Sequence, residues 1–513
     1  MRRRPDILLL VLDTLRADRL QSYGSSDAIT PAVDALAEES TLFRFAIAPA
    51  QWSIPSHASL FTGVYPSIHD TTQSNSILPE GLPTLAERLR DAGYHTAAFC
   101  NNPLVGVINN GLRRGFDSFL NYAGLWTSRP NQAGARPGVY DRIRQRFKGW
   151  LTDLITRTQD AFARNDALLE LSLTPLFVPM WQTALSFKGN SRRSLDDAAR
   201  LFIQRDGLAP DQPVFAFINL MGIHMPYRAP QPYVQRFAPQ VLRDPSARRF
   251  LRQFNTDAFG WLAPLADPVD SEHKAVLDGM YNAEAAYQDH LVGQFFDRLR
   301  QAGRLDQSLV IVLSDHGDHL GEHQLIGHST SLYNELVHVP LIIRDGTGAF
   351  RAGAAVDHFV STRRVFHTAL AAAGAASDAE RALTLAEDVR GQPERGVAFS
   401  ESIPALNFLR MINKRRPDLT RTYALDQYRI AVCSDNHKLI QIGADRFEMY
   451  DLINDPAEER DLSQSQPDRL EKMRQMIADF TRRASDASQT AGISLGEPDP
   501  AVAQRLRSLG YLD

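Results

Sequence analysis

The segment of residues 52–63 is rich in hydroxyl groups and contains the first residue that could do chemistry. Pro55 has a fixed φ and no N–H, which suits the first position of a helix, so we expect Ser53 at or just before the helix cap. The free N–H groups and the helix dipole favour an anion or a developing alkoxide at this place. Ser53 is therefore either an ordinary helix cap or a nucleophile, and as a nucleophile it needs a base or a metal to activate it.

Two acids and a histidine could supply that activation. Asp13 follows an apolar run at residues 7–12, and Asp315 and His316 follow a second apolar run that ends at residue 313. Such runs are typical of buried parallel strands, and ligand sites in open α/β sheets lie where the strands end. Asp and His are good ligands for a divalent ion of the Mn²⁺ or Zn²⁺ kind, so the sequence predicts a metal site that includes the serine hydroxyl. The alternative for Asp13 is that it caps the next helix.

Three further histidines are candidates for contact with an anionic substrate. His57 lies one helical turn after Ser53, His224 follows the strand-like run at residues 213–220, and His328 follows the loop that carries the metal ligands. These side chains could donate hydrogen bonds around the anion or protonate a leaving group. A hydroxyl beside a divalent ion predicts displacement at phosphorus or sulfur through a covalent intermediate on Ser53.

Strand-like and helical segments alternate through most of the chain, which is typical of the α/β class. The sequence therefore predicts a large, mostly parallel sheet flanked by helices, with the candidate residues at one sheet edge. The expected strands are residues 7–12, 41–48, 94–100, 213–220, 309–313 and 339–344.

Two parts of the chain break this alternation. Residues 121–200 contain three Trp, several Pro and helical stretches, and we interpret them as an insertion that could form a lid, a substrate wall or an oligomer contact. Residues 352–395 are rich in Ala and predict helices, whereas short alternating runs after residue 428 predict an antiparallel sheet. We expect a catalytic domain over residues 1–395, with the insertion at about 121–200, and a C-terminal α+β subdomain with a tail over residues 396–513.

The composition excludes several classes of protein. The chain has 513 residues, of which 43% are hydrophobic and 23% charged, as expected of a globular protein with more than one small core. The net charge is −4 and no long basic run occurs, which argues against nucleic acid as a partner. Two Cys residues fit a reducing compartment, and no apolar run has the length of a transmembrane helix. We expect a cytoplasmic protein with a small anionic ester as its substrate, and a homo-oligomer stays open.

Taken in order, these motifs resemble the sulfatase family of the alkaline phosphatase superfamily, nearest to its branch of sulfatases and phosphonate monoester hydrolases. The resemblance covers nearly the whole chain, and it is specific for the family rather than for the substrate. The segments that carry it are residues 13–18, 53–63, 224–227, 314–323 and 450–458.

The resemblance implies an alkaline phosphatase-like fold with a smaller C-terminal unit. It also implies that Asp13, Asp315 and His316 bind the metal and that Ser53 is a nucleophile that touches it.

For the remaining histidines, the resemblance implies contacts with the substrate. His224 matches a His that contacts the substrate anion or the leaving group. His328 and His57 fall where sulfatases usually have a Lys and an Arg, respectively.

Departures from the family pattern bear on the chemistry. In typical sulfatases an Arg lies four residues after the nucleophile, and the machinery that makes formylglycine reads this motif. His57 replaces that Arg here, so conversion of Ser53 to formylglycine is not expected. Thr14 replaces the second acid of the N-terminal pair, and Asn101 and Asn102 replace a Lys and a His. The loss of Arg and Lys leaves fewer fixed positive charges around the anion. A His in place of Asn after Asp315 favours relatives that act on phosphorus and favours a transition metal.

We therefore expect a hydrolase of sulfate or phosphate esters that uses one divalent ion, Mn²⁺, Zn²⁺ or Ca²⁺, and a covalent intermediate on Ser53. The alternatives are a phosphodiesterase or phosphonate monoester hydrolase with unmodified Ser53, a transferase of a phospho-group to an alcohol, and a catalytically silent binding protein.

Overall fold

The two most apolar segments of the sequence form neighbouring strands in the middle of the molecule. In the computed structural model, β1 (Asp6–Leu12) and β6 (Ser308–Leu313) pair in parallel, with Leu8 opposite Val310, and all of their residues are buried. Strands covered on both faces need apolar side chains at every position, which explains the continuous apolar runs. The structure describes residues 4–122, 188–256, 260–328, 330–386, 391 and 393–490.

These two strands belong to a nine-stranded sheet that is mostly parallel. Only β9 and β10 run antiparallel to their neighbours. The predicted large, mostly parallel α/β sheet is confirmed. The strand order is β11 (Ala354–Ser361), β2 (Thr41–Ile47), β10 (Leu341–Asp345), β6, β1, β5 (Val214–Leu220), β3 (His95–Cys100) and β4 (Ser118–Asn121), with β9 (His338–Val339) beside β2.

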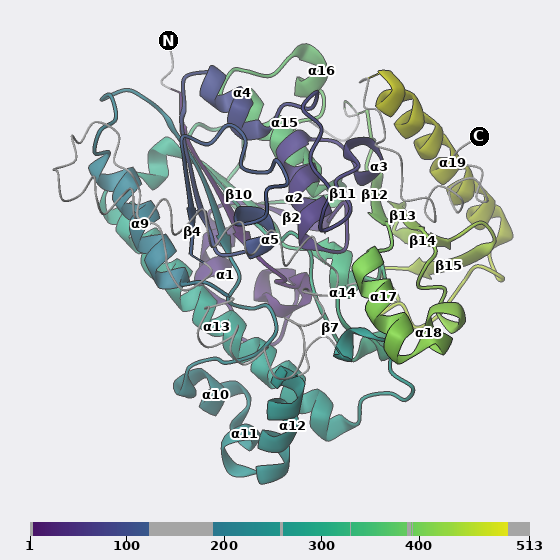
Figure 1. Cartoon of the computed structure of the whole chain (residues 1–513). Helices are drawn as coiled ribbons and strands as arrows, with labels where there is room; N and C mark the ends of the chain where they lie inside the picture. The colour runs from purple at the N-terminus through teal and green to yellow at the C-terminus, as the bar shows by residue number, and fades with distance from the viewer. Residues whose placement is uncertain are drawn as a thin grey trace.

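Helices cover both faces of this sheet, and a separate apolar cluster fills the space under each layer (Figure 1). One layer contains α1 (Pro31–Glu38), α9 (Ser191–Gln204) and α13 (Ser271–Gln301). The other contains α2 (Ser53–Thr62), α4 (Leu85–Asp91) and α15 (Val365–Ala372). The other elements of this part of the chain are α3 (Pro66–His69), α5 (Pro103–Gly106), α10 (Gln231–Phe237), α11 (Pro239–Arg243), α12 (Pro245–Thr256), α14 (Asn334–Val337), α16 (Asp378–Arg381) and the β7 (His319–Leu320)–β8 (Ile326–Gly327) pair.

A second, antiparallel sheet lies in the C-terminal part of the chain, as predicted (Figure 1). The long helix α19 packs on it through an apolar cluster. The boundary near residue 395 stays a prediction. The elements are β12 (Ala398–Ser402), β13 (Arg429–Ser434), β14 (His437–Ile442), β15 (Arg446–Asp451), α17 (Leu406–Arg415), α18 (Pro417–Thr422) and α19 (Pro467–Thr490).

The prediction of helices throughout residues 352–395 is wrong at its start. Residues 354–361 form β11, which pairs in parallel with β2 and places Phe359 opposite Phe45. Alanine favours a helix, but pairing with an open sheet edge outweighs this weak local preference. Residues 123–187, most of the expected insertion, lie outside the described residues, and the last part of it forms α9 on the main sheet. Within the described part of the chain, no helix is both long and apolar enough to cross a membrane.

Candidate functional site

The predicted metal ligands meet at the carboxyl ends of the two central strands. Asp13 directly follows β1, and Asp315 and His316 follow β6 after one residue. Each of the three offers a ligand atom within 4.8 Å of those of the other two, and all three side chains are fully buried. Parallel pairing of β1 with β6 brings the residues together although about 300 residues separate them.

The turn after β1 is held in an unusual conformation. Thr14 has a φ of 63°, in the left-handed region that a β-branched residue rarely adopts. Its N–H lies 3.4 Å from Asp315 Oδ1. Tyr281 of α13 donates a hydrogen bond to Thr14 O (2.7 Å) and accepts one from Arg16 N (2.9 Å). These contacts hold the turn that carries Asp13 in its strained conformation. Backbone strain of this kind is often found at functional sites.

The loop after β6 is packed just as tightly. Ser56 of α2 donates a hydrogen bond to Asp315 O (2.7 Å), and Gly317 N donates one to Leu336 O (2.8 Å). A Cβ on Gly317 would lie 2.0 Å from Glu335 O, so only glycine allows this approach. The geometry therefore fixes Asp315 and His316 from both sides.

Unpartnered oxygens at this place fit a cation. Asp13 Oδ1 and Asp315 Oδ2 are buried and have no hydrogen-bond partner among the described residues. Burial raises the pKa of both carboxyls, and each would be costly to ionise without a positive charge beside it. His316 Nδ1 donates a hydrogen bond to Gly317 O (2.9 Å), so the lone pair of Nε2 is available to bind a cation. Burial lowers the pKa of His316 to about 3. A neutral imidazole and two carboxylates are a suitable donor set for a divalent ion.

Ser53 faces this group from the first turn of α2. Its Oγ lies 3.2 Å from His316 Nε2. The helix begins at Ser53, with Trp52 as its cap and Pro55 at the third position, so the expectation that Pro55 begins the helix is wrong. Proline is tolerated throughout the first turn because the N–H groups there have no partner inside the helix. The start of α2 thus presents the hydroxyl to the candidate metal ligands.

His57 lies one helical turn after Ser53 in α2 and is fully buried. Its Nδ1 is 2.8 Å from Ser53 O and 3.4 Å from Asp315 Oδ2, and its Nε2 is 3.3 Å from Asn219 Nδ2. If the amide of Asn219 donates to Nε2, the proton of the imidazole is on Nδ1 and points to the Ser53 carbonyl. Both ring nitrogens are thus engaged with protein atoms, which supports a positioning role, and the substrate contact stays a prediction.

Two asparagines in the site were not predicted as site residues. Asn102 Nδ2 donates to Asp13 Oδ2 (2.7 Å) and lies 3.0 Å from Ser53 Oγ. Asn219 Nδ2 lies 3.2 Å from Asp13 Oδ2. A signal for Asn219 existed, since it is the one polar residue in the apolar run of β5. For Asn102 the signal was its position directly beyond β3, at the same sheet edge.

His328 and His224 extend the site beyond His316. The ring centroids of His328 and His316 are 4.4 Å apart, and those of His328 and His224 are 4.9 Å apart. His328 Nδ1 lies 2.8 Å from Asp318 Oδ1, which leaves Nε2 for other contacts. Burial lowers the pKa of His328 to about 4. Burial, together with the nearby imidazole of His328, also lowers the pKa of His224 to about 4. Both imidazoles are therefore neutral at neutral pH in this arrangement.

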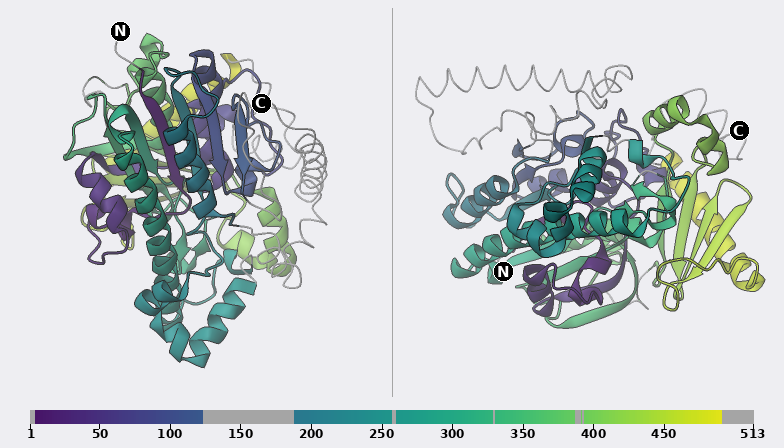
Figure 2. Two further views of the ribbon diagram at one scale, coloured as in Figure 1. Left: turned by 90° about the vertical axis from the view of Figure 1, so that its left-hand side faces the viewer. Right: turned by 90° about the horizontal axis from the view of Figure 1, so that it is seen from below.

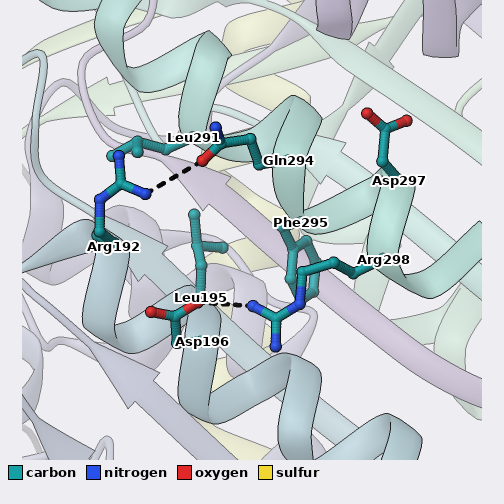
Figure 3. Close-up of a pocket in the computed structure, with 8 residues that line it drawn as sticks. All are labelled: Arg192, Leu195, Asp196, Leu291, Gln294, Phe295, Asp297 and Arg298. Carbon is teal, nitrogen blue, oxygen red and sulfur yellow. Dashed lines mark hydrogen bonds and ion pairs between the residues drawn. The ribbon is translucent and has the colours of Figure 1, made fainter.

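A surface groove lies between α9 and α13 in the part of the chain that the structure describes. None of the candidate site residues lines it. Figure 3 shows that Arg192 reaches Gln294 and that Arg298 pairs with Asp196, at 3.2 and 2.6 Å. The groove lies beside these two helices, away from the strand ends that carry the metal ligands. We therefore place the functional site at the strand ends.

Fold and site together define an α/β protein with a buried serine beside three residues that could hold a metal ion. The sulfatase family model matches residues 5–375 of the chain. The chain therefore belongs to the sulfatase family, within the alkaline phosphatase superfamily.

The relatives are distant. A sulfatase of Escherichia coli K12, YidJ, is 24% identical over 360 residues, which are 68% of this chain and 64% of that protein, so the chain matches slightly less than two thirds of its length. An arylsulfatase of Clostridium perfringens is 23% identical over 72% of this chain and 74% of that protein. The structure of a phosphonate monoester hydrolase of Agrobacterium radiobacter superposes with a TM-score of 0.64 and 21% identity, over 94% of this chain and 96% of that one. This likeness shows a shared fold.

Proposed function

We propose that this protein hydrolyses singly charged sulfate or phosphorus esters and that unmodified Ser53 attacks the substrate. The observation that supports this most directly is the environment of Ser53 Oγ, which lies 3.2 Å from His316 Nε2 and 3.0 Å from Asn102 Nδ2. A hydroxyl is rarely buried beside three potential metal ligands without a role in binding or catalysis.

One divalent ion, Mn²⁺, Zn²⁺ or Ca²⁺, is the proposed cofactor. Asp13, Asp315, His316 and the Ser53 hydroxyl would hold it. When bound, such an ion lowers the pKa of a hydroxyl and neutralises an anionic substrate oxygen. Asn102 keeps the hydroxyl in place by its contact with Oγ while its amide also binds Asp13.

In the proposed first step, Ser53 Oγ forms a bond to sulfur or phosphorus. The bond to the leaving oxygen breaks, its electron pair goes to that oxygen, and the serine proton passes to solvent. His224 is the candidate to protonate the leaving oxygen, because an anionic substrate beside the imidazole raises its pKa again. His328 is the candidate contact for the anion: with Nδ1 donating to Asp318, Nε2 can donate to the anion once the ring is protonated, which an anionic substrate beside it favours. Water then attacks sulfur or phosphorus, the bond to Oγ breaks and Ser53 is restored.

The charges around the site favour a substrate with one negative charge. Within the part of the chain that the structure describes, the contacts of Ser53 and of the three ligands come from His, Asn, Ser, Thr and main-chain groups, and none comes from Lys or Arg. Two carboxylates balance one divalent ion, and the imidazoles of His316 and His328 are neutral before the substrate binds. A phosphodiester, a phosphonate monoester or a sulfate ester carries one charge, whereas a phosphate monoester carries nearly two at neutral pH and is stabilised less well.

The test is turnover of a matched set of aryl esters by metal-reconstituted enzyme: sulfate, phosphate monoester, phosphodiester and phosphonate monoester. We expect the phosphate monoester to be the poorest of the four. A clear preference for it would contradict the charge argument.

Mass spectrometry of the peptide that contains residue 53 tests the chemical state of the nucleophile. An unmodified serine in an enzyme active on the diester or phosphonate supports the proposal. Formylglycine in an enzyme that prefers the sulfate would overturn it in favour of a sulfatase of the usual kind. The cytoplasm as location and a small ester as substrate stay predictions.

A further inference from the structure

The helices α10, α11 and α12 form a projection that we call the helical arm, residues 231–256. It extends from the body at the bottom of Figure 1 and of the left view in Figure 2. Its apolar side chains, such as Val234 and Phe254, are buried, and the ring of Phe250 stacks on His273 of α13 with centroids 3.8 Å apart. The arm is therefore an ordered part of the structure with a firm base.

The polar surface of the arm is strongly basic. The arm has one acidic residue, Asp244, in a protein whose net charge is −4. Arginines that hydrogen-bond within the arm or near it do so with main-chain oxygens, as Arg236 does with Ala28 O and Arg248 with Val241 O. Of the described residues, no acid forms an ion pair with any arginine of the arm. The five exposed arginines are Arg236, Arg243, Arg248, Arg249 and Arg252.

Several exposed arginines elsewhere on the surface do pair with acids. Arg298 pairs with Asp196 at 2.6 Å (Figure 3), and Arg474 pairs with Glu471 at 2.9 Å. The arm thus presents unneutralised charge, which a surface maintains at a cost in self-repulsion and which attracts an anionic partner.

An exposed apolar residue lies within this basic surface. Leu242 is 36% exposed, one of three large hydrophobic side chains exposed on the described part of the chain. Arg243 follows it, and Arg248 donates a hydrogen bond to its carbonyl oxygen (2.7 Å). A leucine surrounded by arginines matches the interface of an anionic bilayer, where charge attracts the protein and an apolar side chain enters the headgroup region. A soluble polyanion would use the charge but gives no reason for the leucine.

The arm is also linked to the candidate site. Asn255, near the end of α12, accepts a hydrogen bond from Tyr227 N (2.9 Å) and donates one to Tyr227 O (2.8 Å). Tyr227 lies three residues after His224. The base of the arm is therefore hydrogen-bonded to the segment that carries a site residue.

We propose that the helical arm docks this protein onto an anionic lipid surface. The inference rests on the charge and exposure of the arm and is independent of the proposed function.

The test is binding of the full-length protein to vesicles of neutral phospholipid with and without an anionic phospholipid, measured by sedimentation at low and high salt. We expect binding only to the anionic vesicles, and weaker binding at high salt. Because each arginine near such a surface contributes about 1 kcal/mol, the variant Arg248→Gln/Arg249→Gln/Arg252→Gln should bind roughly a hundredfold less well.

The matched control removes three exposed arginines that have acidic partners: Arg298→Gln, Arg474→Gln and Arg482→Gln. This variant has the same net charge as the arm variant and should bind nearly as well as the unchanged protein. Leu242→Asn, which changes no charge, should weaken binding several-fold. Thermal unfolding and turnover of a soluble ester should be unaffected in all three.

Several results would overturn the proposal. These are no binding to anionic vesicles, equal loss of binding in the arm and control variants, and binding to soluble polyphosphate without binding to vesicles, which would identify a polyanion site. If the triple arm variant does not fold, the single variants Arg243→Gln and Leu242→Asn decide by the same criterion.

Discussion

The Nε2 atom of His316 lies 3.2 Å from the Oγ atom of Ser53. One atom comes from the loop after a central strand and the other from the first turn of a helix in the covering layer. Because Gly317 O accepts the proton of Nδ1, Nε2 of His316 has a free lone pair that can accept a hydrogen bond from the hydroxyl or bind an ion. The pair therefore links the proposed nucleophile to the candidate metal ligands.

Replacing the nucleophile should remove activity without unfolding the protein. For Ser53→Ala we expect kcat/KM to fall by at least about a thousandfold, since no covalent intermediate can form. Ser59→Ala is the matched control in the same helix, because its hydroxyl contacts His69 at 3.0 Å rather than the site. Ester turnover and intact protein mass after brief exposure to substrate measure both effects. Full activity of Ser53→Ala would refute the covalent route.

Asn102 should matter through position rather than through chemistry. Asn102→Ala removes the contacts with Asp13 and with Ser53 Oγ, so we expect kcat to fall about 10- to 100-fold, as for other residues that orient metal ligands. Asn102→Asp should be worse, because it places a second carboxylate against Asp13.

The neighbouring residue provides the control for this prediction. Asn101→Ala also removes a buried amide, but that amide contacts Ser191 Oγ at 3.2 Å and not the ligands. If Asn101→Ala and Asn102→Ala lost the same amount of activity and of thermal stability, the loss would be structural and the positioning role would be rejected.

The sequence predicted the part of this structure that strands control. Two apolar runs identified central strands, and parallel strands share one edge, so Asp13, Asp315 and His316 could be grouped without coordinates. Asn102 and Asn219 reach Asp13 across 89 and 206 residues, through the lateral order of strands that no local pattern contains. The start of α2 was misplaced for a similar reason, because proline is allowed at several positions of a first helical turn.

His69 predicts a pH dependence of stability. Thr71 N donates to its Nδ1 (3.0 Å), so the proton is on Nε2, and burial lowers the pKa of His69 from 6.5 to about 3. The unfolded chain therefore binds a proton below pH 6.5 that the folded protein binds only near pH 3. Stability is complete above pH 6.5 and is lost as pH falls through this window, by about 2 kcal/mol at pH 5.

Urea unfolding of His69→Gln against pH tests this cause. The variant should be less stable at pH 7, but its decline between pH 7 and pH 5 should be smaller by about 2 kcal/mol. His290→Gln, which replaces an exposed histidine, should decline as the unchanged protein does. An unaltered decline in His69→Gln would show that other groups cause the acid sensitivity.

Removal of the ion should affect stability as well as activity. Asp13 Oδ1 and Asp315 Oδ2 are buried and have no hydrogen-bond partner among the described residues, so a cation that binds them should stabilise the folded state by about 3 kcal/mol at a hundredfold excess over Kd. Chelator-treated protein should therefore unfold at a lower temperature and have no esterase activity, and Mn²⁺, Zn²⁺ or Ca²⁺ should restore both. Because burial raises the pKa of both carboxyls, the stabilisation should weaken as pH falls and protons compete with the ion.

Asp315→Asn should abolish the stabilisation, whereas Asp306→Asn, which changes an exposed acid paired with Arg344, should retain it. A metal-induced shift that persists in Asp315→Asn would place the ion somewhere other than the ends of β1 and β6.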